Sequence, residues 1–185
     1  MDTKKIETAV RNILIAVGED PKRKDIKDTP RRIAKMYEEI LSGTKSDPEK
    51  ELEAIFEKER DEIVLLKNIP FYSMCEHHML PFVGKAHVAY IPSNNRVTGM
   101  SKLVRVVDIF AKRLQVQERI ATDIADIIMR KLKPKGALVI IEAEHMCISM
   151  RGIKKPGVMT ITSAVRGVFR KNEKTRSEAM ALIRG

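Results

Sequence analysis

The sequence has few of the residue types that support several common classes of protein. Two cysteines among 185 residues are too few for the disulfide framework of a small secreted domain. Tryptophan is absent and aromatic residues make up 4% of the chain, which leaves little surface on which single-stranded bases could stack. No apolar run approaches the roughly 18 residues of a membrane-spanning helix, and the first residues lack the pattern of a secretory signal. We therefore expect a soluble, cytoplasmic, globular protein without a membrane as partner.

Positive charge is the abundant feature of the composition. The 35 lysines and arginines outnumber the 25 aspartates and glutamates, which gives a formal net charge of +10. A surplus of this sign favours a polyanionic partner, either a nucleic acid or a phosphorylated small molecule. The excess comes from residues 101–119 and 151–176, and charges balance in the rest of the chain. Charge alone leaves both kinds of partner open.

The hydrophobic pattern changes from helical to strand-like near residue 60. Apolar residues recur at helical spacing before Gly18 and again before Gly43. Thr29 is a candidate helix cap, and Pro30 suits the first helical position that follows it. A charge-rich segment comes next, so we expect an N-terminal helical region over residues 1–60 and a second domain over residues 61–185.

Strand-like and helical patterns of the second domain follow the order β-β-α-α-β-β. No strand alternates singly with a helix, which excludes a doubly wound parallel sheet and favours an α+β layer in which antiparallel strands pack on a helix pair. The expected elements, in chain order, are strands over 63–66 and 83–91, helices over 103–110 and 120–132, and strands over 137–141 and 158–168.

The histidines and cysteines gather in two short stretches. All except His87 lie in the segments 75–78 and 145–147. Cys75 and His78 have a spacing that lets one loop present a thiolate and an imidazole to a tetrahedral Zn²⁺, and Cys147 is a candidate third ligand. Three protein ligands leave a position for water, which zinc ionises near neutral pH, so the pattern favours metal-assisted hydrolysis.

Two other interpretations of these residues are open at this point. The cysteines can be inert buried thiols among hydrogen-bonded histidines, or they can form a disulfide, which a reducing cytoplasm disfavours. His77 and His145 need not bind a metal, because an imidazole that titrates near neutrality is also a natural general acid or base.

Several polar residues suggest an anionic ligand with a base. Ser101, Lys102 and Arg105 lie at the predicted start of a helix, where backbone N–H groups and the helix dipole favour a phosphate. Arg151 follows Cys147 closely and is a candidate bidentate phosphate contact. Each of these cations can equally be a solvated surface charge.

The segment Gln117–Glu118 interrupts the helical pattern between two apolar helices. A carboxylate there can accept two N–H bonds from an amidine-like base edge, although an ordinary helix cap explains it as well.

Five runs of residues resemble the signature segments of GTP cyclohydrolase I, in the same order. The similarity extends from Asp28-Thr29-Pro30 to Lys174-Thr175-Arg176 and therefore covers nearly the whole chain. The five runs are Phe71-Tyr72-Ser73-Met74-Cys75-Glu76-His77-His78, Pro81-Phe82-Val83-Gly84-Lys85, Gly99-Met100-Ser101-Lys102-Leu103, Gln115-Val116-Gln117-Glu118-Arg119, and Glu144-His145-Met146-Cys147 with Arg151-Gly152.

The resemblance implies a fold, an assembly and a reaction. It implies a tunnelling fold, in which subunits join their sheets into a barrel, and a homodecamer of two stacked pentameric rings with active sites between subunits. It implies that GTP and water are converted to formate and 7,8-dihydroneopterin triphosphate, the first step of tetrahydrofolate biosynthesis.

The resemblance also implies roles for the residues of the metal-binding stretches. Cys75, His78 and Cys147 match the zinc ligands of the family. The zinc-bound water would attack C8 of the guanine while His145 protonates N7, and His77 would assist ring opening and formate release. This agrees with the chemistry, because an amidine-like carbon is a poor electrophile until N7 is protonated.

Substrate-binding roles follow in the same way. Glu118 would anchor the N–H edge of the guanine, and Gln117 would support that pocket through its backbone. The residues that match the contacts of the ribose and the triphosphate are Ser101, Lys102, Arg105 and Arg151. Because the three cations lie in the two segments with excess positive charge, the resemblance favours a local field for a small polyanion, and we expect no nucleic acid as partner.

Three rival interpretations are testable. An enzyme of the same fold can use a cysteine nucleophile and nicotinamide, as nitrile reductases acting on deazaguanine do, but the three-ligand set argues against it. A basic nucleic-acid-binding protein with a structural zinc would need a fourth ligand, which His77 or His145 would have to supply. A family member can also serve a regulatory partner or make a modified product from GTP.

Overall fold

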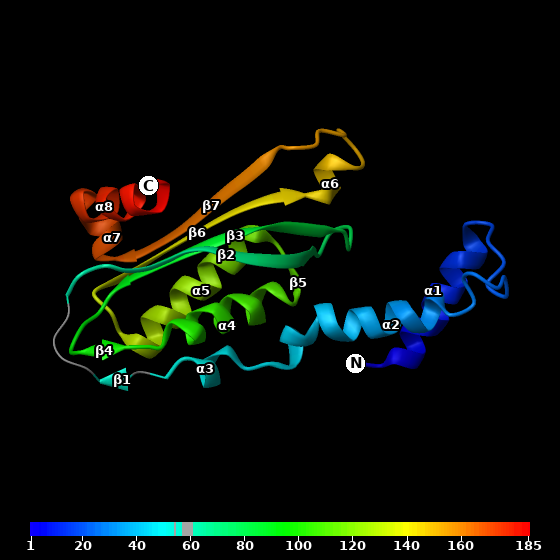
Figure 1. The fold of residues 1–185 in the computed structure, drawn as a ribbon, viewed down its shortest axis with the longest axis horizontal. Helices are drawn as coiled ribbons and strands as arrows, with labels where there is room; N and C mark the ends of the chain where they lie inside the picture. Colours follow the sequence, from blue (N-terminus) through cyan, green and yellow to red (C-terminus); the bar gives the residue numbers. More distant parts are fainter. Residues whose placement is uncertain (54, 57–60) are drawn as a thin grey trace. The chain divides into compact units, whose positions relative to one another are not determined.

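The computed structural model describes residues 1–53, 55–56 and 61–185 of the chain (Figure 1). Contacts between residues divide it into two compact units, Met1–Ser42 and Gly43–Gly185. The domain boundary predicted at residue 60 falls beside residues outside the described part and stays a prediction. Within the described ranges, no helix combines the length and the apolar character needed to cross a bilayer.

The first unit consists of two helices, α1 (Thr3–Ala16) and α2 (Thr29–Ile40). The side chain of Asp2 caps α1 by accepting a hydrogen bond from the Lys5 backbone N–H at 3.1 Å. α2 begins at Thr29, the residue predicted as its cap, and Asp28 occupies the N-cap position without a side-chain bond. Pro30 lies in the first turn, where its missing N–H costs no hydrogen bond.

The second unit is built around a five-stranded sheet in the order β5-β2-β3-β6-β7. β5 pairs in parallel with β2, and the other neighbours are antiparallel. A separate pair is formed by β1 (Ile55–Phe56) and β4 (Arg96–Val97). The strands of the sheet are β2 (Val64–Cys75), β3 (Pro81–Ile91), β5 (Leu114–Gln115), β6 (Gly136–His145) and β7 (Met159–Gly167).

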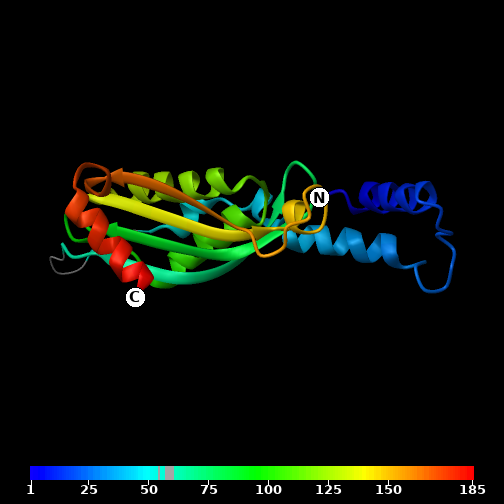
Figure 2. The same cartoon turned by 90° about the horizontal axis from the view of Figure 1, so that it is seen from above.

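Helices cover both faces of this sheet, as the two views show (Figures 1 and 2). The long helices α4 and α5 pack on one face, and α7 and α8 pack on the other near one end of the strands. The helices of this part of the chain are η1 (Ser42–Lys45), α3 (Pro48–Glu51), α4 (Met100–Ala111), α5 (Gln117–Leu132), α6 (Met146–Ser149), α7 (Val168–Lys171) and α8 (Glu173–Arg184).

Alternate residues of β6 feed two separate cores. Val139 and Ile141 pack against α4 and α5, whereas Leu138 and Ile140 pack against α7 and α8. Because successive side chains of a strand point to opposite faces, a strand covered on both sides needs a continuous apolar run, and that is the run from residue 137 to 141 in the sequence.

The predicted β-β-α-α-β-β arrangement is confirmed, including the antiparallel sheet and the helix pair of a tunnelling fold. β2, β3 and β6 are longer than predicted, and the largest difference is in β2, which continues past Leu66 to Cys75. A register shift between Leu66 and Ile69 accommodates Lys67 and Asn68, and Asn68 takes a positive φ of 59°. A bulge of this kind inserts polar residues without ending the strand.

Candidate active site

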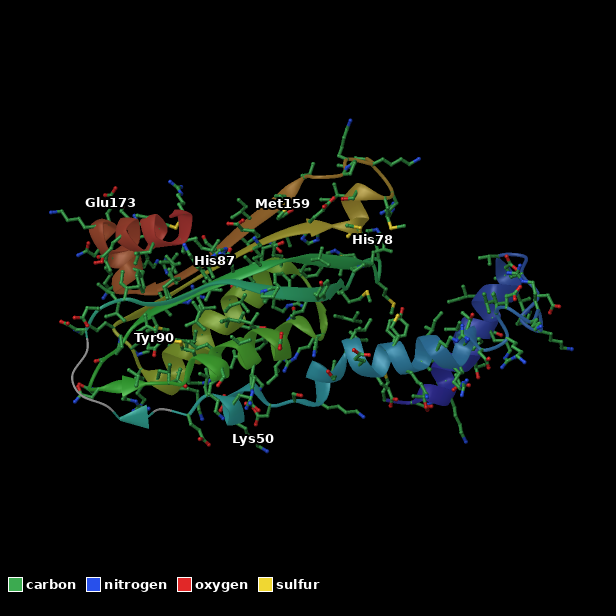
Figure 3. The ribbon with its side chains drawn as sticks, in the orientation of Figure 1. Lys50, His78, His87, Tyr90, Met159 and Glu173 are labelled. Carbon is green, nitrogen blue, oxygen red and sulfur yellow. The ribbon has the colours of Figure 1, made fainter. Side chains whose placement is uncertain are left out.

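Strand register brings two distant parts of the chain to one end of the sheet. β2 and β6 flank β3 and both run antiparallel to it, so both end beside the first residues of β3. Cys75 is the last residue of β2, and Cys147 lies in α6 directly after β6. Figure 3 shows His78 at this end of the sheet, next to α6.

A tight turn between β2 and β3 presents His78. The Cys75 N–H donates to the Leu80 carbonyl and the Met79 N–H donates to the Cys75 carbonyl, each at 2.9 Å. Met79 adopts a positive φ of 51°, which lets the chain reverse within a few residues. The loop predicted from the spacing of Cys75 and His78 is therefore a hydrogen-bonded turn with a defined conformation.

The ligand atoms of Cys75, His78 and Cys147 all lie within 4.8 Å of one another. Zinc holds sulfur at about 2.3 Å and imidazole nitrogen at about 2.0 Å, so its tetrahedral ligands lie slightly closer together than this limit. Burial and the neighbouring Cys75 thiol raise the pKa of Cys147, and a bound cation would reverse that effect by stabilising the thiolates. Both cysteines are free, and the donor set is consistent with a metal.

Arg151 contacts the metal-binding cluster through His78. Its Nη1 atom lies 2.7 Å from His78 Nε2, and because a guanidinium only donates, this nitrogen of the ring accepts. Glu144 fixes the segment that carries Arg151, since its Oε1 accepts hydrogen bonds from Ser149 Oγ at 2.6 Å and from the Gly157 N–H at 2.8 Å. These two bonds lower the pKa of Glu144.

His145 is the last residue of β6 and is held by two side chains. Its ring stacks on Phe82, with centroids 4.5 Å apart and planes 4° apart. Its Nε2 lies 2.8 Å from Oε1 of Gln117, the first residue of α5. Burial lowers the pKa of His145, and the nearby charge of Glu118 opposes this shift.

His77 and Glu118 are exposed beside this cluster. His77 belongs to the turn after β2, and Glu118 lies in the first turn of α5. An ion pair joins these two elements, because Arg119 donates to both carboxylate oxygens of Glu76 at 2.6 and 3.1 Å. The pKa of Glu76 is lowered chiefly by this hydrogen bonding.

The predicted phosphate contacts at the start of α4 lie elsewhere in the same chain. α4 leads into β5 and so ends near Cys75, whereas Ser101 precedes that end by about 15 Å of helix. Glu51 of α3 pairs with Lys102 at 3.9 Å and with Arg105 at 3.4 Å.

Contacts at the far end of α5 confirm this separation. The Arg96 guanidinium, just before α4, donates to the Lys131 carbonyl near the last residue of α5 at 2.8 Å. The first turn of α4 and the first turn of α5 therefore lie at opposite ends of the helix pair, as Figure 1 shows. Within one chain, the structure does not bring Ser101, Lys102 and Arg105 together with the metal-binding cluster.

Comparison with known proteins agrees with the sequence motifs over the length of the chain. The profile of the family described as GTP cyclohydrolase I matches residues 6–184. This chain belongs to the GTP cyclohydrolase I family.

Curated relatives support this membership. The GTP cyclohydrolase 1 of Carboxydothermus hydrogenoformans is 63% identical over 99% of this chain and 95% of its own length. The GTP cyclohydrolase 1 of Pelotomaculum thermopropionicum is 62% identical over 100% of this chain and 98% of its own length. The enzyme of Clostridioides difficile is 58% identical over 99% of this chain and 97% of its own length. Among solved structures, the archaeosine synthase QueF-Like in the apo form matches with a TM-score of 0.49 and 20% identity, over 59% of this chain and 97% of that chain.

Proposed function

We propose that this protein is a zinc-dependent GTP cyclohydrolase I that converts GTP and water to formate and 7,8-dihydroneopterin triphosphate. The observation that carries the proposal is the cluster of Cys75, His78 and Cys147 in a chain of this family. The product would enter tetrahydrofolate biosynthesis. A cytoplasmic location suits this function, because the two free thiols stay reduced there.

The three residues fit zinc by their chemistry. Two thiolates and one imidazole form a set that this ion prefers, and three protein ligands leave one position open. Bound there, zinc would supply a water molecule that ionises near neutral pH. Cys75 and Cys147 have the task of holding the ion, and the turn that carries His78 orients the third ligand.

His145 has the task of protonating N7 of the guanine. N7 must gain a proton before C8 becomes electrophilic enough for attack by water, and a positioned imidazole is suited to give it. His145 is the last residue of β6 and precedes Cys147 by two residues, so the acid and the metal ligand come from consecutive elements of the chain. His77 would assist ring opening from the exposed side of the turn.

Glu118 and Arg151 have binding tasks in this proposal. The Glu118 carboxylate is exposed in the first turn of α5, where it can accept the two N–H groups on the guanine edge. Arg151 is exposed and already lies at the cluster through its contact with His78, so its remaining donors can reach a phosphate.

A second copy of the chain would supply the remaining contacts. Ser101, Lys102 and Arg105 lie at the far end of the helix pair, so one chain cannot bring both groups of residues to one GTP. We therefore propose a homo-oligomer with active sites between subunits, a decamer of two pentameric rings as in the resemblance. Glu51 holds Lys102 and Arg105 until the triphosphate replaces its carboxylate.

An assay with GTP tests the function. Purified protein with about one zinc per chain should release formate and form a pterin that fluoresces after oxidation, and a chelator should abolish both. Protein that holds zinc and yields neither product would refute the proposal. Product formation that persists after complete removal of the metal would refute the role of zinc.

A further inference from the structure

We propose that the side chain of Gln117 is a positioning element that holds His145 in the tautomer with its proton on Nε2. This inference rests on the proposed function, in which His145 is the acid that protonates N7. It concerns a side-chain contact of Gln117 with a protein group, and it gives Gln117 no contact with the substrate.

Three acceptors fix the orientation of the Gln117 amide. Its Nε2 atom lies 2.9 Å from the Ile141 carbonyl, 2.9 Å from the Thr160 carbonyl and 3.1 Å from Thr162 Oγ1. Carbonyl oxygens only accept hydrogen bonds, so the NH₂ group must face β6 and β7. The amide cannot turn over without placing its oxygen against two carbonyl oxygens.

The fixed amide determines which nitrogen of His145 carries hydrogen. Gln117 Oε1 lies 2.8 Å from His145 Nε2, and an amide oxygen only accepts. His145 Nε2 must therefore donate, whether the ring is neutral or charged. The buried ring of Phe82 fixes the plane of the imidazole by stacking at 4.5 Å, so the two neighbours together determine both the direction and the tautomer of the ring.

This arrangement leaves Nδ1 as the nitrogen that exchanges protons. Nε2 keeps its hydrogen bond to Gln117, so N7 of the guanine would meet the ring at Nδ1 in the proposed reaction. The ring then needs no rearrangement of its hydrogen bond to Gln117 during turnover. An enzyme group held in its reactive tautomer avoids that reorganisation during the reaction.

Gln117 is 1% exposed and joins α5 to β6 and β7, so a purely structural role is the alternative. Gln115 offers a matched control. It is also a glutamine that is 2% exposed, and its side chain donates to the Phe110 carbonyl at 3.1 Å. Replacing either glutamine by methionine removes a buried amide group and keeps a side chain of similar length.

Steady-state kinetics of zinc-loaded variants separate the two roles. Gln117→Met should keep its zinc and its KM for GTP, and its kcat should fall on the order of 100-fold, the scale of a misplaced general acid. Gln115→Met should keep kcat close to the unmodified enzyme. Equal falls in kcat in Gln117→Met and Gln115→Met, or no fall in either variant, would overturn the positioning role.

Raman spectroscopy of the imidazole gives a second, independent readout, since a ring-stretching band differs in frequency between the two neutral tautomers. Subtracting the spectrum of His145→Gln, at alkaline pH, isolates the band of His145. The unmodified enzyme should show the Nε2–H tautomer, and Gln117→Met should show a mixture. A band of the Nδ1–H tautomer in the unmodified enzyme would overturn the inference even if Gln117→Met does not fold. Failure of the enzyme to turn over GTP would instead refute the proposed function and leave this spectroscopic test intact.

Discussion

Cys147 and His145 are two residues apart and have different tasks in the proposed reaction. β6 ends at His145, and Cys147 lies in α6, which begins at the next residue. We expect Cys147→Ala to lose zinc and activity together, because two remaining ligands hold the ion poorly. His145→Ala should keep about one zinc per chain and lose turnover by at least about 100-fold. Metal content and formate release measure the two effects. Loss of zinc from His145→Ala would make His145 a ligand and contradict the assignment.

Arg151 should contribute to binding of GTP through charge. We expect Arg151→Ala to raise KM about tenfold at low salt, the size of one charge-assisted contact, while the zinc content stays the same. Added salt should reduce the difference from the unmodified enzyme, because it screens exposed charges.

Lys154 of the same exposed segment is the matched control. Its substitution by alanine should change KM far less than Arg151→Ala does. Equal effects of the two substitutions would indicate a general field around the segment and no specific phosphate contact at Arg151.

His87 should make the stability of the fold depend on pH. The ring is buried, accepts from the Asn68 N–H at 3.4 Å, and lies 3.7 Å from Glu142 Oε1. Burial lowers the pKa of His87, against an opposing effect of Glu142. The unfolded chain, with a histidine pKa near 6.5, therefore binds its proton first as pH falls. Stability is full above about pH 6.5 and decreases below it toward the lowered pKa of the folded state.

Thermal unfolding at several pH values measures this effect. The melting temperature of His87→Gln should decrease less between neutral and mildly acidic pH than that of the unmodified protein. His77→Gln, which replaces an exposed histidine, should leave the pH dependence unchanged. Identical pH dependence in His87→Gln and the unmodified protein would exclude His87 as the responsible group.

Single residues differ in how well the sequence predicts their surroundings. Cys75, His78 and Cys147 could be grouped from the sequence because cysteine and histidine are rare and concentrated in this chain. The side-chain role of Gln117 could not, since its partners Ile141 and Thr160 come from strands whose register only the fold defines. The sequence also gave no indication that His87 is buried, because strand alternation allows either face.

Among the elements of the fold, β3 requires a residue without a side chain at Gly84, where it pairs closely with β6. A Cβ added at Gly84 would lie 1.9 Å from the Glu142 carbonyl oxygen and 2.7 Å from Cα of Ala143. We expect Gly84→Ala to destabilise the fold by about 3 kcal/mol or more, because backbone must move to accept the methyl group.

Chemical denaturation of zinc-loaded protein measures this change. The neighbouring substitution Lys85→Ala affects an exposed side chain of the same strand and should change stability by about 0.5 kcal/mol or less. If Gly84→Ala unfolds at the same denaturant concentration as Lys85→Ala, β3 and β6 do not approach each other as closely at Gly84 as the structure shows.

The order of the elements could be predicted, and their exact bounds could not. Apolar periodicity indicated the helix pair and the strands that flank it. β2 was predicted too short because Lys67 and Asn68 break its pattern, and the bulge that absorbs them depends on pairing with β3. The predicted cap of α2 was off by one residue, since Asp28 and Thr29 are both acceptable at that position by sequence alone.

For the whole molecule, the proposed division of the site between two chains predicts complementation. Cys147→Ala and the double variant Lys102→Ala/Arg105→Ala should each have little activity alone. When the two are assembled together at random, about a quarter of the sites should combine two intact halves, and activity should return in that proportion.

Assembly of Cys147→Ala with His78→Ala is the control, because both changes affect the same half of the site. That mixture should stay inactive. Absence of recovery in the first mixture, with mixed oligomers demonstrated by mass spectrometry, would contradict active sites between subunits.

The position of the cysteines at the ends of two strands also affects the order of folding. Cys75 and His78 are synthesised long before Cys147, and the three meet only when β3 has paired with both β2 and β6. In the proposed zinc enzyme, tight binding of the ion would therefore be a late event that follows closure of the sheet. Because three converging ligands bind zinc far better than an open chain does, uptake of the ion would make the last step of folding hard to reverse.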